Sequence, residues 1–131
     1  MTAIRPAGIE TRLAERYMEA LGKMRIGNHE FAVPTGARAS GGLPVIQSKS
    51  YFKWEIKQVT DGHVTAWKGT EARSVPHAEF LAAQAQLFRG LVRGRMKEKG
   101  EREDAAIRAL GALHPPLAAM FEIKVRRDTG T

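Results

Sequence analysis

Residues 51–69 read YFKWEIKQVTDGHVTAWKG, and this stretch predicts a β-hairpin around which the rest of the chain is arranged. Asp61 and Gly62 are its turn signal. A two-residue type I′ turn needs positive φ at both central positions, which Asp tolerates and Gly adopts freely. The pairs predicted from this turn are Thr60 with His63, Val59 with Val64, Gln58 with Thr65, Lys57 with Ala66, Ile56 with Trp67 and Glu55 with Lys68.

This pairing separates an apolar face from a charged one, because directly opposed residues of an antiparallel pair share a face. A slip of one residue would invert one strand, so the agreement between the strands favours this register. The inner face is predicted to carry Phe52, Trp54, Ile56 and Trp67. The outer face is predicted to carry Lys53, Glu55, Lys57 and Lys68, and the alternation continues back through Lys49.

Amphipathic helices are predicted on both sides of the hairpin. Over residues 7–24 the apolar positions are Ile9, Leu13, Tyr17, Ala20, Leu21 and Met24. Over residues 76–99 they are Phe80, Leu81, Leu87, Phe88, Leu91 and Val92, and the pattern decays beyond Val92, so the last turns should project beyond the core. Gly100 is expected to end this helix.

The remaining segments are shorter. We expect a short strand in residues 29–33 and a helix over 101–113 with the apolar stripe Ala106, Leu110 and Leu113. Residues 117–125 fit either a helix or a last strand, and residues 126–131 are predicted to be a disordered tail. The predicted fold is a single α+β domain over residues 1–125. It is a small antiparallel sheet centred on the hairpin, with one face covered by an N-terminal helix and a C-terminal pair of helices.

The composition is that of an ordinary globular domain with excess positive charge. Hydrophobic residues make up 43% of the chain, which is enough for a core, and no apolar run approaches the length of a membrane span. There is no cysteine, which fits the cytoplasm, where we expect the protein to reside. The net charge of +7 and the pI near 10.1 favour a polyanionic partner, either nucleic acid or an acidic protein surface.

One group of cations lies on the long predicted helix. Arg89, Arg93 and Lys97 recur every four residues and form a single row, which can follow a phosphate backbone. Arg95 and Lys99 lie in the same basic segment, although a solvated charged face is an equal alternative. Gly90 and Gly94, one turn apart, could allow close contact with a second copy in a homodimer.

A second group lies on the predicted outer face of the hairpin, where Lys49, Lys53, Lys57 and Lys68 surround Tyr51. Sheet faces bind single strands through aromatic stacking, and Tyr51 is the only aromatic residue predicted there. Arg38 lies in the glycine-rich segment 35–43, whose spacing matches no phosphate-binding motif, so we expect a plain loop.

No pattern for catalysis, a metal or a cofactor is found. The four histidines are scattered along the sequence, and we expect His63 and His77 to be exposed. We therefore expect a non-enzymatic nucleic-acid-associated protein, a regulator or an accessory subunit. The alternative is a protein-interaction module, an inhibitor or assembly subunit, that docks an acidic protein.

Overall fold

The computed structural model of the chain describes residues 11–26, 29–30, 32–33, 53–60 and 62–129. Over these residues the helices are α1 (Thr11–Ile26), α2 (His77–Lys99), α3 (Glu103–Leu113) and α4 (Pro115–Thr129). The strands are β1 (His29–Glu30), β2 (Lys53–Val59), β3 (His63–Lys68) and β4 (Glu71–Pro76). The described helices include none that is both long and apolar enough to cross a membrane.

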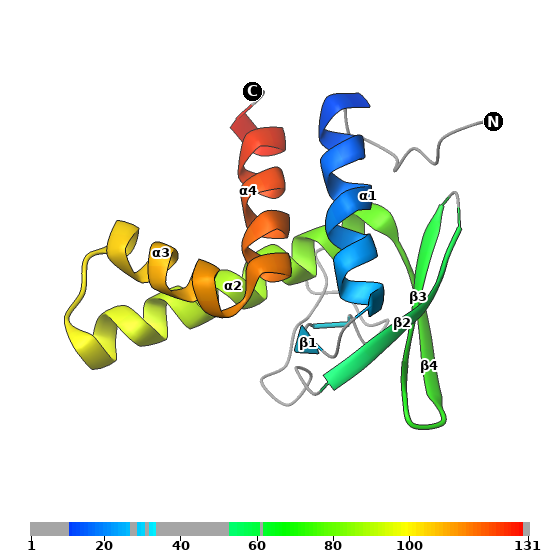
Figure 1. Cartoon of the computed structure of the whole chain (residues 1–131), viewed down its shortest axis with the longest axis horizontal. Helices are drawn as coiled ribbons and strands as arrows, with labels where there is room; N and C mark the ends of the chain where they lie inside the picture. The colour runs from blue at the N-terminus through cyan, green and yellow to red at the C-terminus, as the bar shows by residue number, and fades with distance from the viewer. Residues whose placement is uncertain (1–10, 27–28, 31, 34–52, 61, 130–131) are drawn as a thin grey trace, which may run out of the picture.

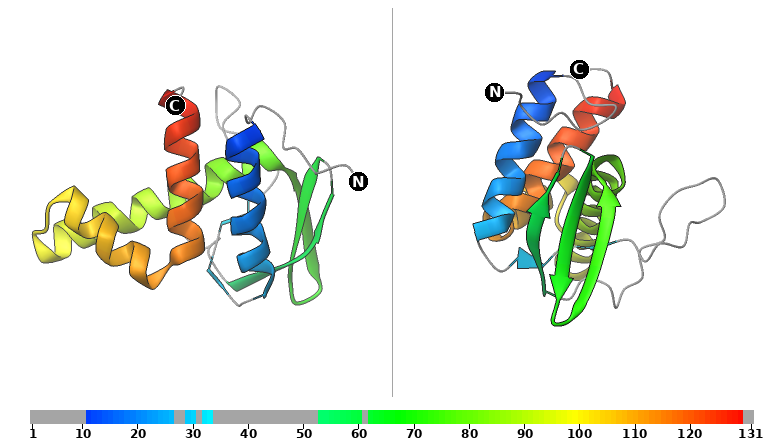
Figure 2. Two further views of the ribbon diagram at one scale, coloured as in Figure 1. Left: turned by 45° about the horizontal axis from the view of Figure 1, so that its top comes forward. Right: turned by 90° about the vertical axis from the view of Figure 1, so that its right-hand side faces the viewer.

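The strands form one antiparallel sheet in the order β1-β2-β3-β4, with the β2–β3 hairpin at its centre. The described helices gather on one side of this sheet, and none of them lies over the other side (Figure 1, Figure 2). The predicted small α+β fold is therefore confirmed. We call the side of the sheet that faces the helices the inner face and the opposite side the outer face.

The register of the central hairpin follows the prediction only near the turn. Val59 pairs with Val64 and Gln58 with Thr65, but Ile56 then pairs with Ala66 and Glu55 with Trp67. Lys57 is the extra residue of a β-bulge, which puts two residues of one strand against one of the other.

The bulge moves β3 by one position relative to β2, so the predicted placement of Trp67 on the inner face is wrong. Val64 and Ala66 are buried together with Trp54 and Ile56, and Trp67 is only half-buried.

At the turn of this hairpin, Gly62 does not have the positive φ that a type I′ turn requires, and Asp61 lies outside the described residues. Hydrogen bonds from within the hairpin and from α2 hold the described part of this turn. The His63 N–H donates to the Thr60 hydroxyl (3.2 Å), and the His77 N–H donates to the Gly62 carbonyl (3.3 Å). The start of α2 therefore holds the turn, which the local sequence could not indicate.

The β3–β4 hairpin was not predicted. Lys68 pairs with Glu71, so Gly69 and Thr70 are the central residues of a two-residue turn. Gly69 has φ of +62°, and Thr70 does not have positive φ, which is the pattern of a type II′ turn. The segment before Pro76 is thus a strand, and Pro76 precedes the first residue of α2.

The buried positions of α1 and α2 are those that the periodicity predicted. Leu13, Tyr17, Ala20, Leu21 and Met24 of α1 are buried, as are Phe80, Leu81, Leu87, Phe88 and Val92 of α2, while Leu91 is partly buried. Beyond Val92 no residue of α2 is fully buried, and this end of the helix extends away from the sheet alongside α3 (Figure 1). Gly100 ends α2 as predicted, with φ of +66° and its N–H donating to the Met96 carbonyl (2.8 Å).

The C-terminal region decides one open alternative and corrects one expectation. Residues 117–125 belong to helix α4, which lies beside α1 (Figure 1) and whose Glu122 Oε1 accepts from Arg16 (2.8 Å). The helix continues to Thr129, so the predicted disordered tail is wrong for residues 126–129. Ion pairs at the i,i+4 spacing, Lys124–Asp128 (2.8 Å) and Glu122–Arg126 (3.1 Å), stabilise these last turns.

In α3, Ala106 and Leu110 are buried as predicted, but Leu113 is 64% exposed. Leu113 is the last residue of α3, where the chain turns into α4, and this position lies outside the packed stripe.

Candidate nucleic-acid interface

The first candidate surface is the row of Arg89, Arg93 and Lys97 on α2, which we call the α2 row. All three residues are exposed. Consecutive helical residues point about 100° apart, so Arg89 and Arg93 point out to the side of Phe88 and Val92, which anchor α2 in the core. At a rise of about 1.5 Å per residue, the α2 row spans roughly 12 Å along the helix axis.

Two exposed glycines, which carry no side chain, lie beside the α2 row. Gly90 and Gly94 are exposed, and a Cβ atom built at either would have no described atom within 4 Å. None of the described residues would therefore block a second copy of the chain from approaching α2 closely at these glycines.

The α2 row has little neutralising charge around it. Within the described part of the chain, no carboxylate forms an ion pair with Arg93, Lys97 or Lys99, although Glu98 is exposed nearby in sequence. The Arg89 guanidinium lies 5.5 Å from the centre of the Phe121 ring of α4, a cation–π contact that orients this cation.

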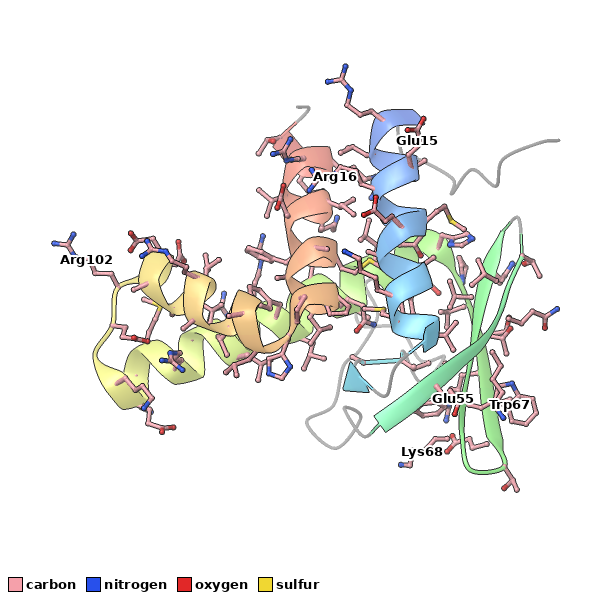
Figure 3. The ribbon with its side chains drawn as sticks, in the orientation of Figure 1. Glu15, Arg16, Glu55, Trp67, Lys68 and Arg102 are labelled. Atoms are coloured by element: carbon pink, nitrogen blue, oxygen red, sulfur yellow. The ribbon has the colours of Figure 1, made fainter. Side chains whose placement is uncertain are left out.

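Arg95 differs from the α2 row, although the sequence grouped it with these cations. Its Nε donates to Glu101 Oε1 (2.5 Å), and only 25% of its side chain is exposed. Arg95 thus connects the end of α2 to the turn before α3. Lys99 and Arg102 are exposed at that turn, which lies at the end of the helical arm far from the sheet (Figure 3).

The second candidate surface, the outer face of the sheet, is not composed as predicted. Lys57 is exposed, and its Nζ lies 5.7 Å from the centre of the Trp67 ring. Lys68 instead lies across from Trp54 on the inner face, with its Nζ 5.9 Å from the Trp54 ring centre. The bulge is the reason for this difference, so the prediction that Lys68 shares the outer face with Lys57 is wrong.

Some predicted contact residues have no described side chain. Lys53 begins β2 and pairs with Glu30 in the backbone register. Lys49, Arg38 and Tyr51 lie outside the described residues.

His77 is buried, and the expectation that it is exposed is wrong. Its Nε2 lies 2.9 Å from the Thr60 carbonyl oxygen and its Nδ1 lies 2.9 Å from the Tyr17 hydroxyl. Because a carbonyl oxygen only accepts, Nε2 must carry a proton. The Tyr17 hydroxyl also donates to the His77 backbone carbonyl (3.3 Å). Burial also raises the pKa of the Tyr17 phenol far above its ordinary value. This network joins α1, the hairpin turn and α2, which is a structural role.

A second buried polar contact was also missed. The Gln84 side-chain amide donates to the Ala32 carbonyl and accepts from the Ala32 N–H (3.0 Å), which gives this backbone segment the partners it would have in a sheet. The described residues contain no group of three or more His, Asp or Glu side chains that could hold a metal ion.

Trp67 is the residue of the outer face that the sequence failed to indicate. Strict alternation along β3 places Trp67 on the same side as the polar residues His63 and Thr65, and this pattern could have predicted its position on the outer face. Comparison of the chain with protein-family models, curated proteins and solved structures gave no match, so the candidate surfaces are interpreted from their own chemistry.

Proposed function

We propose that this protein is a non-enzymatic, cytoplasmic nucleic-acid-associated protein, a regulator or accessory subunit, that contacts phosphates through the α2 row. The observation that carries the proposal is the α2 row itself: three exposed cations on successive helical turns, beside exposed glycines and without a paired carboxylate in the described part of the chain. The outer face of the sheet, with Lys57, is the secondary contact surface.

The charge arrangement suits a regularly spaced polyanion. Each strand of duplex DNA carries one phosphate per about 3.4 Å of axis, so the roughly 12 Å of the α2 row faces about three or four phosphates. Neutralising them releases condensed counterions, which makes the affinity strongly dependent on salt. The net charge of +7 adds a long-range attraction that speeds association.

The experiment is a charge reversal of the α2 row, with all three residues changed to Glu. Exposed substitutions usually cost little stability, so the variant should fold. The dependence of log K on log salt should become less steep by about 3 for a duplex, since each lost phosphate contact removes about 0.9. Affinity at low salt should fall by orders of magnitude.

The control reverses the same number of charges elsewhere, at Arg12, Lys23 and Arg126, which are exposed on α1 and α4. Lys23 and Arg126 form ion pairs with Glu19 and Glu122, so the unfolding free energy of both variants is measured alongside binding. The control changes the net charge equally but leaves the α2 row intact. Equal losses in both variants would mean that net charge alone drives binding. A wild-type protein that binds neither DNA nor RNA at low salt would refute the proposal.

The second candidate function is a protein-interaction module that docks an acidic protein on the same surface. The exposed Gly90 and Gly94 favour it, because a partner helix can approach closely where side chains are absent. A protein partner would bind with saturable stoichiometry and a milder salt dependence than a nucleic acid. A second copy of the chain at this surface would appear as a dimer that the α2-row reversal dissociates in sedimentation velocity.

A further inference from the structure

Trp67 is a large aromatic side chain on the face of the sheet that no described helix covers. The bulge at Lys57 turns Trp67 away from the core, and its side chain projects from the sheet on the side opposite to the helices (Figure 3). The described residues of β3 that pack into the core are instead Val64 and Ala66. Packing of the core therefore does not explain a tryptophan at position 67.

On the β4 side, the neighbours of Trp67 on the outer face are short, whereas Glu55 and Lys57 of β2 lie on its other side. Ala72 of β4 is its cross-strand partner, and the Thr65 hydroxyl donates to the Ser74 hydroxyl (3.2 Å) one pair further along. Ala72 and Ser74 are exposed. The indole is half-buried, and toward β4 it is bordered by short side chains, so it is on this side that a flat ligand can reach the uncovered part of the ring.

Lys57 adds a cation beside this ring. Its Nζ is 5.7 Å from the centre of the Trp67 ring, and the side chain is exposed, so the ammonium group can also contact a bound anion. An aromatic ring and a cation at this separation match the two parts of a nucleotide, a flat base and its phosphate.

We infer that Trp67 and Lys57 form a base-stacking subsite, so that the nucleic acid bound by this protein is single-stranded. This inference rests on the proposed function and adds the substrate class. Bases in a duplex are stacked on one another and have no free face, whereas an unpaired base can stack on the indole. The α2 row attracts any polyanion, and the subsite selects the single strand.

Glu55 lies directly across from Trp67 in the β2–β3 pairing and is exposed. Its carboxylate repels a phosphate near the indole. Glu55→Gln should therefore raise the affinity for a single strand. No such gain is expected if Trp67 has only a packing role and contacts no nucleic acid.

The test uses the protein's own fluorescence. The chain has two tryptophans, so Trp54→Phe leaves Trp67 as the only indole emitter. This variant is titrated with a dT oligonucleotide, with a duplex of equal length and with inorganic polyphosphate. We expect the oligonucleotide to quench Trp67 emission, because a stacked base quenches the indole, and the duplex and polyphosphate to leave it nearly unchanged.

Substitutions at Trp67 measure how much stacking contributes to the affinity for dT. Trp67→Ala should weaken dT binding by about 5- to 150-fold, the range for losing one base–aromatic stack, and leave duplex affinity unchanged. Trp67→Phe should retain most of the affinity, since it keeps a ring. Because the quenching titration leaves position 67 unaltered, it tests the inference even if Trp67→Ala folds poorly.

The outcomes separate the two proposals. If the duplex or polyphosphate quenches Trp67 as strongly as dT does, or if dT binds without quenching, the stacking inference is overturned. In both cases a binding loss on charge reversal of the α2 row would leave the proposed function standing. If no polyanion binds at low salt, both proposals fall.

Discussion

Trp54→Ala and Trp67→Ala should have clearly different effects on stability, because the bulge places the two tryptophans on opposite faces of the sheet. Trp54 is 5% exposed in the core, and deleting a buried Trp side chain typically costs about 3–5 kcal/mol. The register predicted by strict pairing from the turn would give Trp67 the same cost. The two variants therefore test the bulge directly.

The expected cost at Trp67 follows from its contacts. The cation–π contact with Lys57 contributes about 0.5–1 kcal/mol and the cross-strand pair with Glu55 up to about 1 kcal/mol. Trp67→Ala should thus cost about 0.5–2 kcal/mol, at least about 1 kcal/mol less than Trp54→Ala.

Urea denaturation followed by far-UV circular dichroism is the suitable assay, since it does not depend on tryptophan emission. Trp54→Phe is the control. The Trp54 indole N–H is buried without a described hydrogen-bond partner, so removing it costs no hydrogen bond and the variant should stay within about 1.5 kcal/mol of wild type. Equal losses in the two alanine variants, or a loss above about 3 kcal/mol for Trp67→Ala, would show that Trp67 belongs to the core.

Three further predictions test other parts of the structure. Gly69→Val should lower the unfolding free energy by about 1–2 kcal/mol or more, because φ is +62° there. Gly62→Val should have nearly the wild-type unfolding free energy, and a larger loss at Gly62 than at Gly69 would support a type I′ turn at residues 61–62 after all. Gln84→Leu should cost about 2–4 kcal/mol in urea melts, since the buried N–H and C=O of Ala32 lose their partners, and a loss under 1 kcal/mol would contradict this contact. For Tyr17, burial raises the folded-state pKa above the ordinary 10.0, so the stability from the neutral phenol is complete below pH 10 and falls as pH rises beyond it. The stability difference between wild type and Tyr17→Phe should therefore shift against wild type by up to about 1.4 kcal/mol per pH unit above pH 10, and a constant difference would refute it.

Local patterns in the sequence determined the helices and their buried faces. The spacing of Phe80, Leu81, Phe88 and Val92 predicted the core side of α2, because helical period alone fixes which residues share a face. Gly100 was correctly predicted as the helix end, since αL geometry favours glycine there. The exposed α2 row follows from the same period.

The tertiary structure alone decided the register of the sheet and which polar residues are buried. Alternation in β2 and β3 is compatible with either phase, and the choice depends on which side chains fit beneath the helices; this choice turned Trp67 outward and Lys68 inward. His77 looked exposed because its partners, Tyr17 and Thr60, lie 60 and 17 residues away in the sequence. Hydrogen bonds between segments this distant leave no mark on local periodicity, and only the packed chain brings them together.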